Sequence, residues 1–368
     1  MTLYQQQKPS SGAWPFAVAL GAILAVSGCA IRVGPKTIAR DRFDYAAAIT
    51  GSWKQQMLMN MVRMRYFEPP MFLEIAQVIS SYTFEASASV SATDWLGAQT
   101  GSLGGAEGRW SESPTITYNP LFGEKFTKDL LQPIPPAALL SLIQAGWPAD
   151  AVLAVGARAI NGLSAGSRLE LMKRTGDPRF YQTLALLRQL QQGDAFGLRV
   201  EQKEGAAGAV VTLQRGQTDE SMVAAGQTIR KLLRLDPEAQ EFDLAFGSTS
   251  RNDKEIAIAT RSMLEILGET SAGIEVPASH KSEGRVTSFD GAAGTAESMP
   301  KFIVRVRCTE QKPPAGEAFV AVNYRHHWFW VDDRDISSKR GMAFLMMMFT
   351  MVESGGVVTP PVFTISKP

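Results

Sequence analysis

Hydrophobic positions recur with a helical period over residues 41–67. The apolar residues that fall close to one face of this segment are Phe43, Ala47, Met57, Met61 and Met64. Repetition at this spacing predicts a helix with one buried stripe. Because proline cannot donate the amide hydrogen bond of a helix interior, Pro69-Pro70 must end it. We therefore expect a long helix as the first ordered element.

Alternation of apolar and polar residues follows this helix and predicts strands. A first α+β region is therefore expected over residues 41–148. After the helix, its elements are strands at 71–79 and 81–92, a glycine-rich hairpin tip or mobile loop at 95–110, and helices at 121–132 and 135–147. The last of these begins with a proline suited to a first helical turn.

A second α+β region is expected over residues 149–276. Its elements are a helix at 177–192, strands at 196–202 and 209–215, a helix at 219–233, a strand at 241–247 and a helix at 252–269. Residues 277–300 are polar and nearly free of large apolar side chains, which predicts an exposed loop or linker.

The C-terminal segment, residues 301–368, returns to an ordered pattern and is expected to pack on the second region. Its elements are strands at 302–308, 317–324 and 327–333, a helix at 336–353 and a strand at 361–366. Residues 196–246 and 318–365 share a strand-strand-helix-strand order. This order is compatible with an internal duplication, although the two sequences align poorly. The predicted fold class is α+β, with mainly antiparallel sheets.

The amino terminus has the composition of an export signal. Residues 1–15 carry one lysine and no acid, and residues 16–26 are apolar apart from Gly21. This run is shorter than the roughly 20 residues that a membrane-spanning helix needs. Residues 26–29, Val-Ser-Gly-Cys, resemble the lipobox of bacterial lipoproteins. The alternative is a short buried helix with an ordinary core cysteine.

The lipobox resemblance implies a covalent anchor. Residues 1–28 would be a signal peptide removed by cleavage, Cys29 would carry the acyl groups, and residues 29–40 would be a tether. Several acyl chains hold a protein stably on a membrane, whereas one holds it marginally. Ala30 after the cysteine implies an outer membrane, with the protein on its periplasmic face.

The amino-acid composition limits the classes of ligand and partner that we expect. The chain has 37 basic and 36 acidic residues, and Lys8 is the only charged residue among 1–28, so the mature chain would be neutral. A neutral surface binds nucleic acid poorly, and the glycine stretch 97–108 lacks the lysine of a phosphate loop. We expect no nucleic acid, no nucleotide and no cofactor. With Cys29 acylated, Cys308 has no disulfide partner and is expected to be a buried core thiol.

Gly162-Leu163-Ser164-Ala165-Gly166 matches the G-x-S-x-G pattern of esterase-like hydrolases. Ser164 would be the nucleophile, and its base would have to be one of three histidines: His280 in the predicted loop, or His326 or His327 at a predicted hairpin. A glycine- and serine-rich loop, with Ser164 as a turn or cap residue, explains the pattern more simply.

No metal site is expected, because the three histidines lack metal-ligand spacing. Asp332, Asp333 and Asp335 are acidic enough for a divalent ion, but they precede a helix. Capping of that helix by Asp335 is the interpretation we favour.

Trp328 and Trp330 would share one face of the strand at 327–333. Two tryptophans at this spacing could form a platform on which sugar rings stack. The alternative is a strand buried on both faces, which the following helix favours, because it is apolar all round from Met342 to Phe349.

These patterns favour a membrane-anchored periplasmic lipoprotein that acts as a non-enzymatic binding or scaffold subunit of a cell-envelope assembly. Its partners would be the membrane, through acylated Cys29, and another envelope protein. A serine hydrolase using Ser164 and a glycan or peptidoglycan-binding module using Trp328 and Trp330 are the alternatives.

Replacing the predicted acyl acceptor tests the anchor directly. Cys29→Ala should abolish metabolic labelling of the protein with a fatty acid, because the thiol is the proposed attachment point. Cys308→Ala is the matched control and should leave labelling intact. Normal labelling of Cys29→Ala would refute the assignment.

Overall fold

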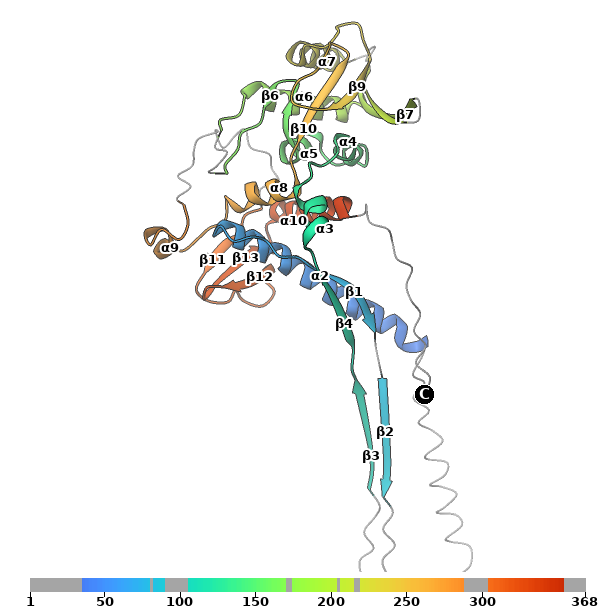
Figure 1. The fold of residues 1–368 in the computed structure, drawn as a ribbon, viewed down its shortest axis with the longest axis vertical. Coiled ribbons are helices and arrows are strands. Elements are labelled where there is room, and N and C mark those ends of the chain that lie inside the picture. Colours follow the sequence, from blue (N-terminus) through green and yellow to red (C-terminus); the bar gives the residue numbers. More distant parts are fainter. Residues whose placement is uncertain are drawn as a thin grey trace, which may run out of the picture. The chain divides into compact units, whose positions relative to one another are not determined.

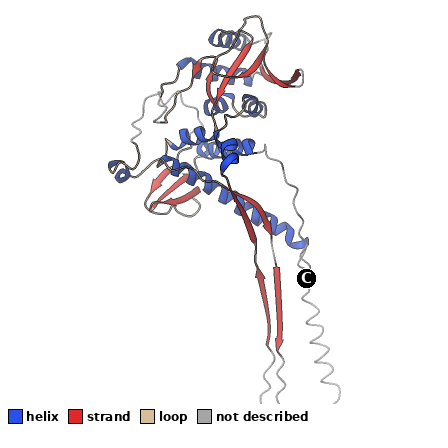
Figure 2. Ribbon diagram, viewed as in Figure 1, coloured by secondary structure: helices blue, strands red, loops and turns tan. Residues whose placement is uncertain are grey.

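The computed structural model describes residues 35–79, 82–89, 105–169, 174–203, 206–214, 219–287 and 304–353. The predicted signal peptide, Cys29 and the strand at 361–366 lie outside these residues. The fold is α+β, with mixed but mostly antiparallel sheets, as predicted (Figure 1 and Figure 2).

The chain divides into two compact units. Unit 1 comprises Met1–Thr50 and Gln77–Ile116, and unit 2 comprises Gly51–Ala76 and Thr117–Pro368. Unit 2 thus takes residues from both predicted α+β regions, 41–148 and 149–276.

The predicted long helix is present as α2 (Pro35–Arg65). It begins inside the predicted tether, so residues 35–40 are helical. Met57 and Met61 are fully buried, whereas Phe43, in unit 1, is 74% exposed. The predicted apolar stripe is therefore buried only toward the end of the helix, which stops before Pro69-Pro70 as expected.

Four strands follow α2: β1 (Leu73–Ile79), β2 (Tyr82–Ser89), β3 (Gly105–Glu112) and β4 (Thr115–Pro120). β1 pairs with β4, and β2 pairs with β3. The hairpin tip or mobile loop predicted at 95–110 was set too long at its end, since 105–110 belong to β3, which pairs antiparallel with β2. These residues supply the hydrogen-bonding partner that β2 needs, and glycine does not prevent a strand where a neighbour strand pairs with it.

The main sheet of unit 2 has the strand order β6-β5-β10-β9-β8-β7. Its strands are β5 (Ala157–Ile160), β6 (Leu163–Ser164), β7 (Phe196–Lys203), β8 (Ala206–Leu213), β9 (Glu241–Phe246) and β10 (Glu255–Thr260). β9 and β10 are parallel, and the other neighbours are antiparallel. The strands predicted in region 2 are therefore confirmed.

The helix predicted at 252–269 was wrong in its first half, which forms β10. The helix α8 occupies only Met263–Ser271. Nearly every residue of β10 is buried, because strands flank it on both sides and both faces are covered. Such a strand has no polar alternation, and its pattern does not distinguish it from a buried helix. Ser262 accepts a hydrogen bond from the amide of Glu265 and so begins the helix there.

Helices pack along this sheet: α4 (Pro136–Gln144), α5 (Ala149–Gly156), α6 (Pro178–Gln192) and α7 (Glu220–Leu233). α5 contacts α4 and α6, and α6 contacts α7. Asp177 and Asp219 cap α6 and α7 through backbone amides. The helix predicted at 121–132 is split into α3 (Gly123–Phe126) and the π-helical turn η1 (Thr127–Leu131).

A second sheet of unit 2 has the order β11-β13-β12. It comprises β11 (Arg307–Thr309), β12 (Ala318–Tyr324) and β13 (His327–Asp332). The predicted strand 302–308 was too long, although Val304 and Val306 are buried between exposed arginines as its alternation required. Cys308 is half-buried rather than fully buried, and burial raises its pKa to about 11.

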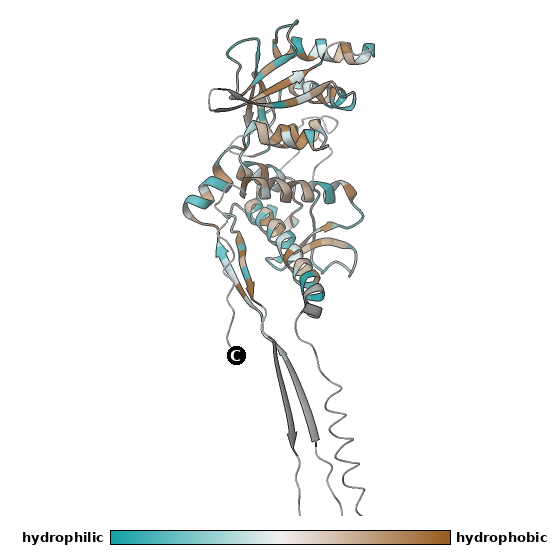
Figure 3. Cartoon of the chain, turned by 90° about the vertical axis from the view of Figure 1, so that its right-hand side faces the viewer, coloured by the Kyte–Doolittle hydropathy of each residue, from teal (hydrophilic) through white to brown (hydrophobic). Residues whose placement is uncertain are grey.

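Two helices accompany this sheet. α9 (Ala278–Ser282) lies in the segment that was predicted to be an exposed loop. This prediction was wrong for α9, whose His280 is buried. α10 (Ile336–Glu353) matches the prediction, and its Phe344 and Phe349 rings lie 5.1 Å from Trp147 and 4.7 Å from Phe72. In Figure 3 the helices carry hydrophobic and hydrophilic residues on the same element, as helices with one buried face do. None of the described helices is long and apolar enough to cross a bilayer.

Of the three aspartates before α10, Asp335 caps the helix and the other two form ion pairs. Asp335 accepts a hydrogen bond of 3.0 Å from the Ser338 amide. Asp332 pairs with Arg307, and Asp333 with Lys339. Each carboxylate thus has its own protein partner.

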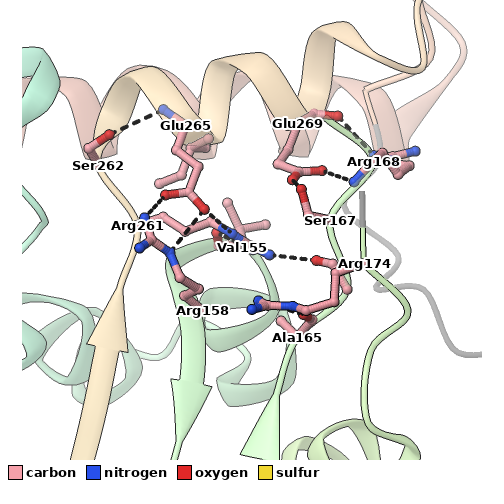
Figure 4. Close-up of polar contacts among 12 residues, drawn as sticks. Val155, Arg158, Ala165, Ser167, Arg168, Arg174, Arg261, Ser262, Glu265 and Glu269 are labelled. Atoms are coloured by element: carbon pink, nitrogen blue, oxygen red, sulfur yellow. Dashed lines mark hydrogen bonds and ion pairs between the residues drawn. The ribbon is translucent and has the colours of Figure 1, made fainter. Parts of the chain in front are cut away.

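Polar contacts fasten the loop after β6 onto α8 (Figure 4). Glu269 accepts hydrogen bonds from the Ser167 hydroxyl and the Arg168 amide. Arg261, only 5% exposed, donates to the carbonyls of Ala154, Val155 and Gly166. Its guanidinium therefore ties the end of α5 to this loop.

Removing this guanidinium should destabilise the protein strongly. In Arg261→Ala three carbonyls in part-buried hydrogen bonds lose their donor. At roughly 1 kcal/mol each, this loss should lower the free energy of unfolding by about 3 kcal/mol. Urea unfolding measures this loss. The exposed Arg251→Ala is the control and should change stability by less than about 0.5 kcal/mol. Equal effects of the two variants would contradict the assignment.

Candidate functional site

The candidate site lies where α2 ends and the chain turns toward Pro69-Pro70. The amides of Tyr66 and Glu68 both donate to the Arg63 carbonyl, at 2.9 and 3.0 Å. Phe67 adopts a left-handed conformation with φ of 60°. This conformation is unfavourable for a bulky residue, so the surrounding structure must hold it in place.

Two polar side chains of α2 hold the segment after the prolines. Asn60 donates to the Met71 carbonyl at 2.7 Å and accepts from the Met71 amide at 2.8 Å. Gln56, one helical turn earlier, makes the same pair of bonds to Leu73, at 3.1 and 2.8 Å. Both amide side chains thereby act as a neighbouring strand would. They fix the position of Met71 beside the helix.

A cavity of about 500 Å³ opens at this junction. Its lining residues are Arg63, Glu68, Pro69, Pro70, Met71, Phe122, Gly123 and Phe126. The volume falls in the range of small-ligand sites, and the lining is mainly apolar, as in most such sites. All the lining residues belong to unit 2.

Glu68 connects this cavity to the turn between β12 and β13. The Tyr324 hydroxyl donates to the Glu68 carboxylate, and Arg325 pairs with the same oxygen at 3.0 Å. The hydrogen bond from Tyr324, helped by Arg325, lowers the pKa of Glu68, which therefore stays ionised. Its charge is already compensated by the protein.

The β12–β13 turn is itself strained. Arg325 and His326, its two turn residues, have φ angles of 49° and 65°. A two-residue turn with both φ values positive normally uses Asn or Gly. Together with Phe67, three unfavourable backbone positions converge on one site, which is where strain is tolerated when the geometry serves a function.

The rings of Tyr66, His280 and His327 pack together beside the β12–β13 turn. The Tyr66 hydroxyl lies 2.7 Å from Nδ1 of His280, and the His280 and His327 rings are 5.0 Å apart. Burial raises the pKa of Tyr66 to about 12. Burial, together with His327, lowers the pKa of His280. A neutral imidazole and a neutral tyrosine therefore share this hydrogen bond.

His280 is enclosed by protein groups in this arrangement. His280 is only 6% exposed and Nδ1 is occupied, so it is poorly placed to exchange a proton with a ligand. The unsatisfied group at the cavity is Arg63, whose Nε is buried and has no hydrogen-bond partner among the described residues. The charge of Arg63 acts on Glu68 across the same lining, but among the described residues no carboxylate forms an ion pair with it, so an anionic group of a ligand could pair with its guanidinium.

The predicted hydrolase residues are arranged differently. Ser164 ends β6, an edge strand antiparallel to β5, and an extended loop follows it. A nucleophile elbow would need a tight turn directly into a helix. In the described part of the chain, none of the three histidines hydrogen-bonds Ser164. His280 is in α9, while His326 and His327 are at the hairpin as predicted.

The two tryptophans lie on β13, the central strand of its sheet. Trp330 is 7% exposed and Trp328 is half-buried. Arg307 and Lys312 lie over the two indole rings, at 5.2 and 5.4 Å from the centroids. These cations cover faces that sugar stacking would use.

Sequence reasoning missed the cavity and Arg63. The only available indication was Pro69-Pro70, which ends a helix abruptly beside aromatic residues. Glu68 bonds to Tyr324 and Arg325, which lie more than 250 positions later in the chain. A local sequence pattern cannot show a contact between such distant residues.

Comparison with family models, with curated proteins and with solved structures found no match to this chain.

Protonation of His280 should reduce stability as the pH falls. The unfolded chain binds a proton on this imidazole near pH 6.5, whereas the folded protein keeps it neutral to a lower pH. The free energy of unfolding should therefore decrease below about pH 6.5. In His280→Gln, whose amide oxygen can still accept from Tyr66, that part of the decrease should disappear.

Urea unfolding at about pH 7.5 and about pH 5.5 measures the difference. His326→Gln removes one histidine from an exposed turn position and is the matched control. An undiminished pH dependence in His280→Gln would contradict the buried neutral assignment.

Proposed function

We propose that this protein is a membrane-anchored periplasmic lipoprotein that serves as a non-enzymatic binding or scaffold subunit of a cell-envelope assembly. Acylated Cys29 would hold it to the inner face of an outer membrane, as the lipobox resemblance implies. The cavity at the end of α2 would receive a segment of a partner protein.

The observation that carries this proposal is the cavity of about 500 Å³ with apolar walls, together with the Arg63 Nε that lacks a hydrogen-bond partner among the described residues. Apolar walls favour an aromatic or aliphatic side chain, and Arg63 favours a carboxylate next to it. Glu68 is already neutralised by Tyr324 and Arg325, so it repels an acidic ligand less than a free carboxylate would.

Exposed apolar residues around the cavity support a protein partner rather than a small molecule. Phe67, Met71 and Phe122 are 64%, 44% and 59% exposed. A cluster of large exposed apolar residues beside a cavity is typical of an interaction surface. Aromatic side chains such as Phe67 and Phe122 often dominate the binding energy of an interface.

A charged residue at the cavity should break the partner contact. With a photocrosslinking residue at Met71 in intact cells, the parent chain should form a discrete crosslinked product. Phe122→Glu should reduce its yield about tenfold or more, because losing one central aromatic contact costs roughly 1.4 kcal/mol or more. Arg63→Glu should reduce it as well, whereas Arg63→Lys should retain part of it.

Phe246→Glu is the matched control, since Phe246 is 62% exposed and lies on β9. Its crosslinking should equal that of the parent chain. The proposal fails if Met71 forms no crosslink, or if Phe246→Glu reduces crosslinking as much as Phe122→Glu does.

A further inference from the structure

His280 on α9 is buried between the end of α2 and the β12–β13 hairpin. The residue is 6% exposed, and its Nδ1 lies 2.7 Å from the hydroxyl of Tyr66. The ring of His327 packs edge to face against it, with the two ring centroids 5.0 Å apart. Water is the main stabiliser of a charged imidazole, so an imidazole enclosed in this way is more stable when it is neutral.

The surroundings of His280 also oppose a positive charge. The charged and titratable groups that act on His280 or on Tyr66 lie on the elements packed around them: Arg65 on α2, Glu283 and Arg285 after α9, Cys308 on β11, Tyr324 on β12, Arg325 in the turn and His327 on β13. Glu283 is the carboxylate among them, and its ion pair with Arg285 at 2.5 Å leaves it little able to compensate an imidazolium. A proton on His280 would therefore add a positive charge among cationic neighbours.

Tyr66 connects His280 to the cavity at the end of α2. The amides of Tyr66 and Glu68 both donate to the carbonyl of Arg63. Arg63 and Glu68 are lining residues of the cavity. The turn after α2 therefore sets the positions of both lining residues, and the bond between Tyr66 and His280 fixes that turn from the side of α9.

α9 and the turn after α2 are both short elements. α9 has five residues. Besides the bond between Tyr66 and His280, the guanidinium of Arg65 donates to the Thr287 carbonyl at 2.8 Å and holds the segment after α9 to α2. Phe67, next to Tyr66, keeps a left-handed conformation whose cost such contacts must offset. A short helix beside strained backbone can open locally at a cost well below that of global unfolding.

We propose that uptake of a proton by His280 releases α9 from Tyr66 and opens the end of α2, so that the cavity loses its shape and its occupant as the pH falls. This inference concerns the regulation of the cavity and rests on the function proposed above. In the open form the imidazolium is surrounded by water, whereas in the closed form it would lie beside His327. The open form therefore takes up the proton in preference to the closed form, and the proton shifts the population toward it.

The pH range of this switch follows from the proton affinity of the two forms. In the closed form, burial and then the nearby His327 lower the pKa of His280. Once exposed, the imidazole binds a proton near pH 6.5. The closed form is therefore favoured above about pH 6.5 and loses this advantage as the pH falls below that value. For one proton, the ratio of open to closed molecules should rise by up to about tenfold between about pH 7.5 and about pH 5.5.

Hydrogen exchange of the full-length protein measures this opening without any partner. The amides of Tyr66, Phe67 and Glu68 donate to backbone carbonyls of α2 and are protected while the turn is closed. After correction for the intrinsic exchange rate at each pH, their opening constant should rise by up to about tenfold from about pH 7.5 to about pH 5.5. The amides in the middle of α6 are the internal control. No rise at the turn, or an equal rise in α6, overturns the proposal.

Variants identify the group that takes up the proton. His280→Gln should abolish the rise, because a neutral amide replaces the imidazole. His326→Gln, at an exposed turn position, is the matched control and should behave like the parent. Tyr66→Phe keeps the ring but lacks the hydrogen bond, so its turn should open about fivefold more at about pH 7.5 and still respond to pH. Circular dichroism verifies that each variant is folded. A rise retained in His280→Gln overturns the role of His280.

The effect on the partner is measured with the photocrosslinking residue at Met71, in cell lysates brought to either pH before irradiation. The parent should lose at least about half of its crosslinked product at the lower pH, and His280→Gln should keep it. Equal yields from the parent at the two pH values would overturn the regulation and leave the proposed docking intact. Absence of a crosslink at both pH values would instead count against the docking, and hydrogen exchange would still decide whether the switch exists.

Discussion

Burial of the last third of α2 is the constraint on which the rest of unit 2 depends. Met57, Leu58, Met61 and Val62 have no exposed surface, so the helix passes through the hydrophobic core. Gln56 and Asn60 lie on the same segment and bond the backbone after the prolines. Packing and hydrogen bonding therefore act on one element, and together they determine where the cavity forms.

The sequence allowed most of the elements to be predicted, because their patterns are local. α10 is apolar nearly all round, and α6 and α7 begin at aspartates whose capping role is recognisable. The errors have a common physical cause. β10, α9 and the first part of β3 contain residues whose burial or pairing depends on segments far away in the chain. A local pattern cannot show which of two conformations distant partners will select.

The same reasoning explains why the candidate site was hidden. Its chemistry is distributed over the end of α2, the β12–β13 turn and α9. Each piece alone has an ordinary interpretation: a helix end, a hairpin and a polar loop. The sequence suggests His280 only as a base for Ser164, whereas its partner in the structure is Tyr66. The three unfavourable backbone conformations at Phe67, Arg325 and His326 are likewise invisible in composition.

These conformations are held in place by contacts between the β12–β13 turn and the end of α2. Each left-handed residue costs roughly 1 kcal/mol or more, and the contacts among Tyr66, Tyr324, Arg325 and Glu68 offset that cost by fixing the turn against α2. The hydrogen bonds occupy the polar groups of Tyr66, Glu68 and Tyr324. The cavity beside these hydrogen bonds has mainly apolar lining residues, with Arg63 among them. A preorganised surface of this kind loses little conformational freedom on binding, which is the property that a docking subunit requires.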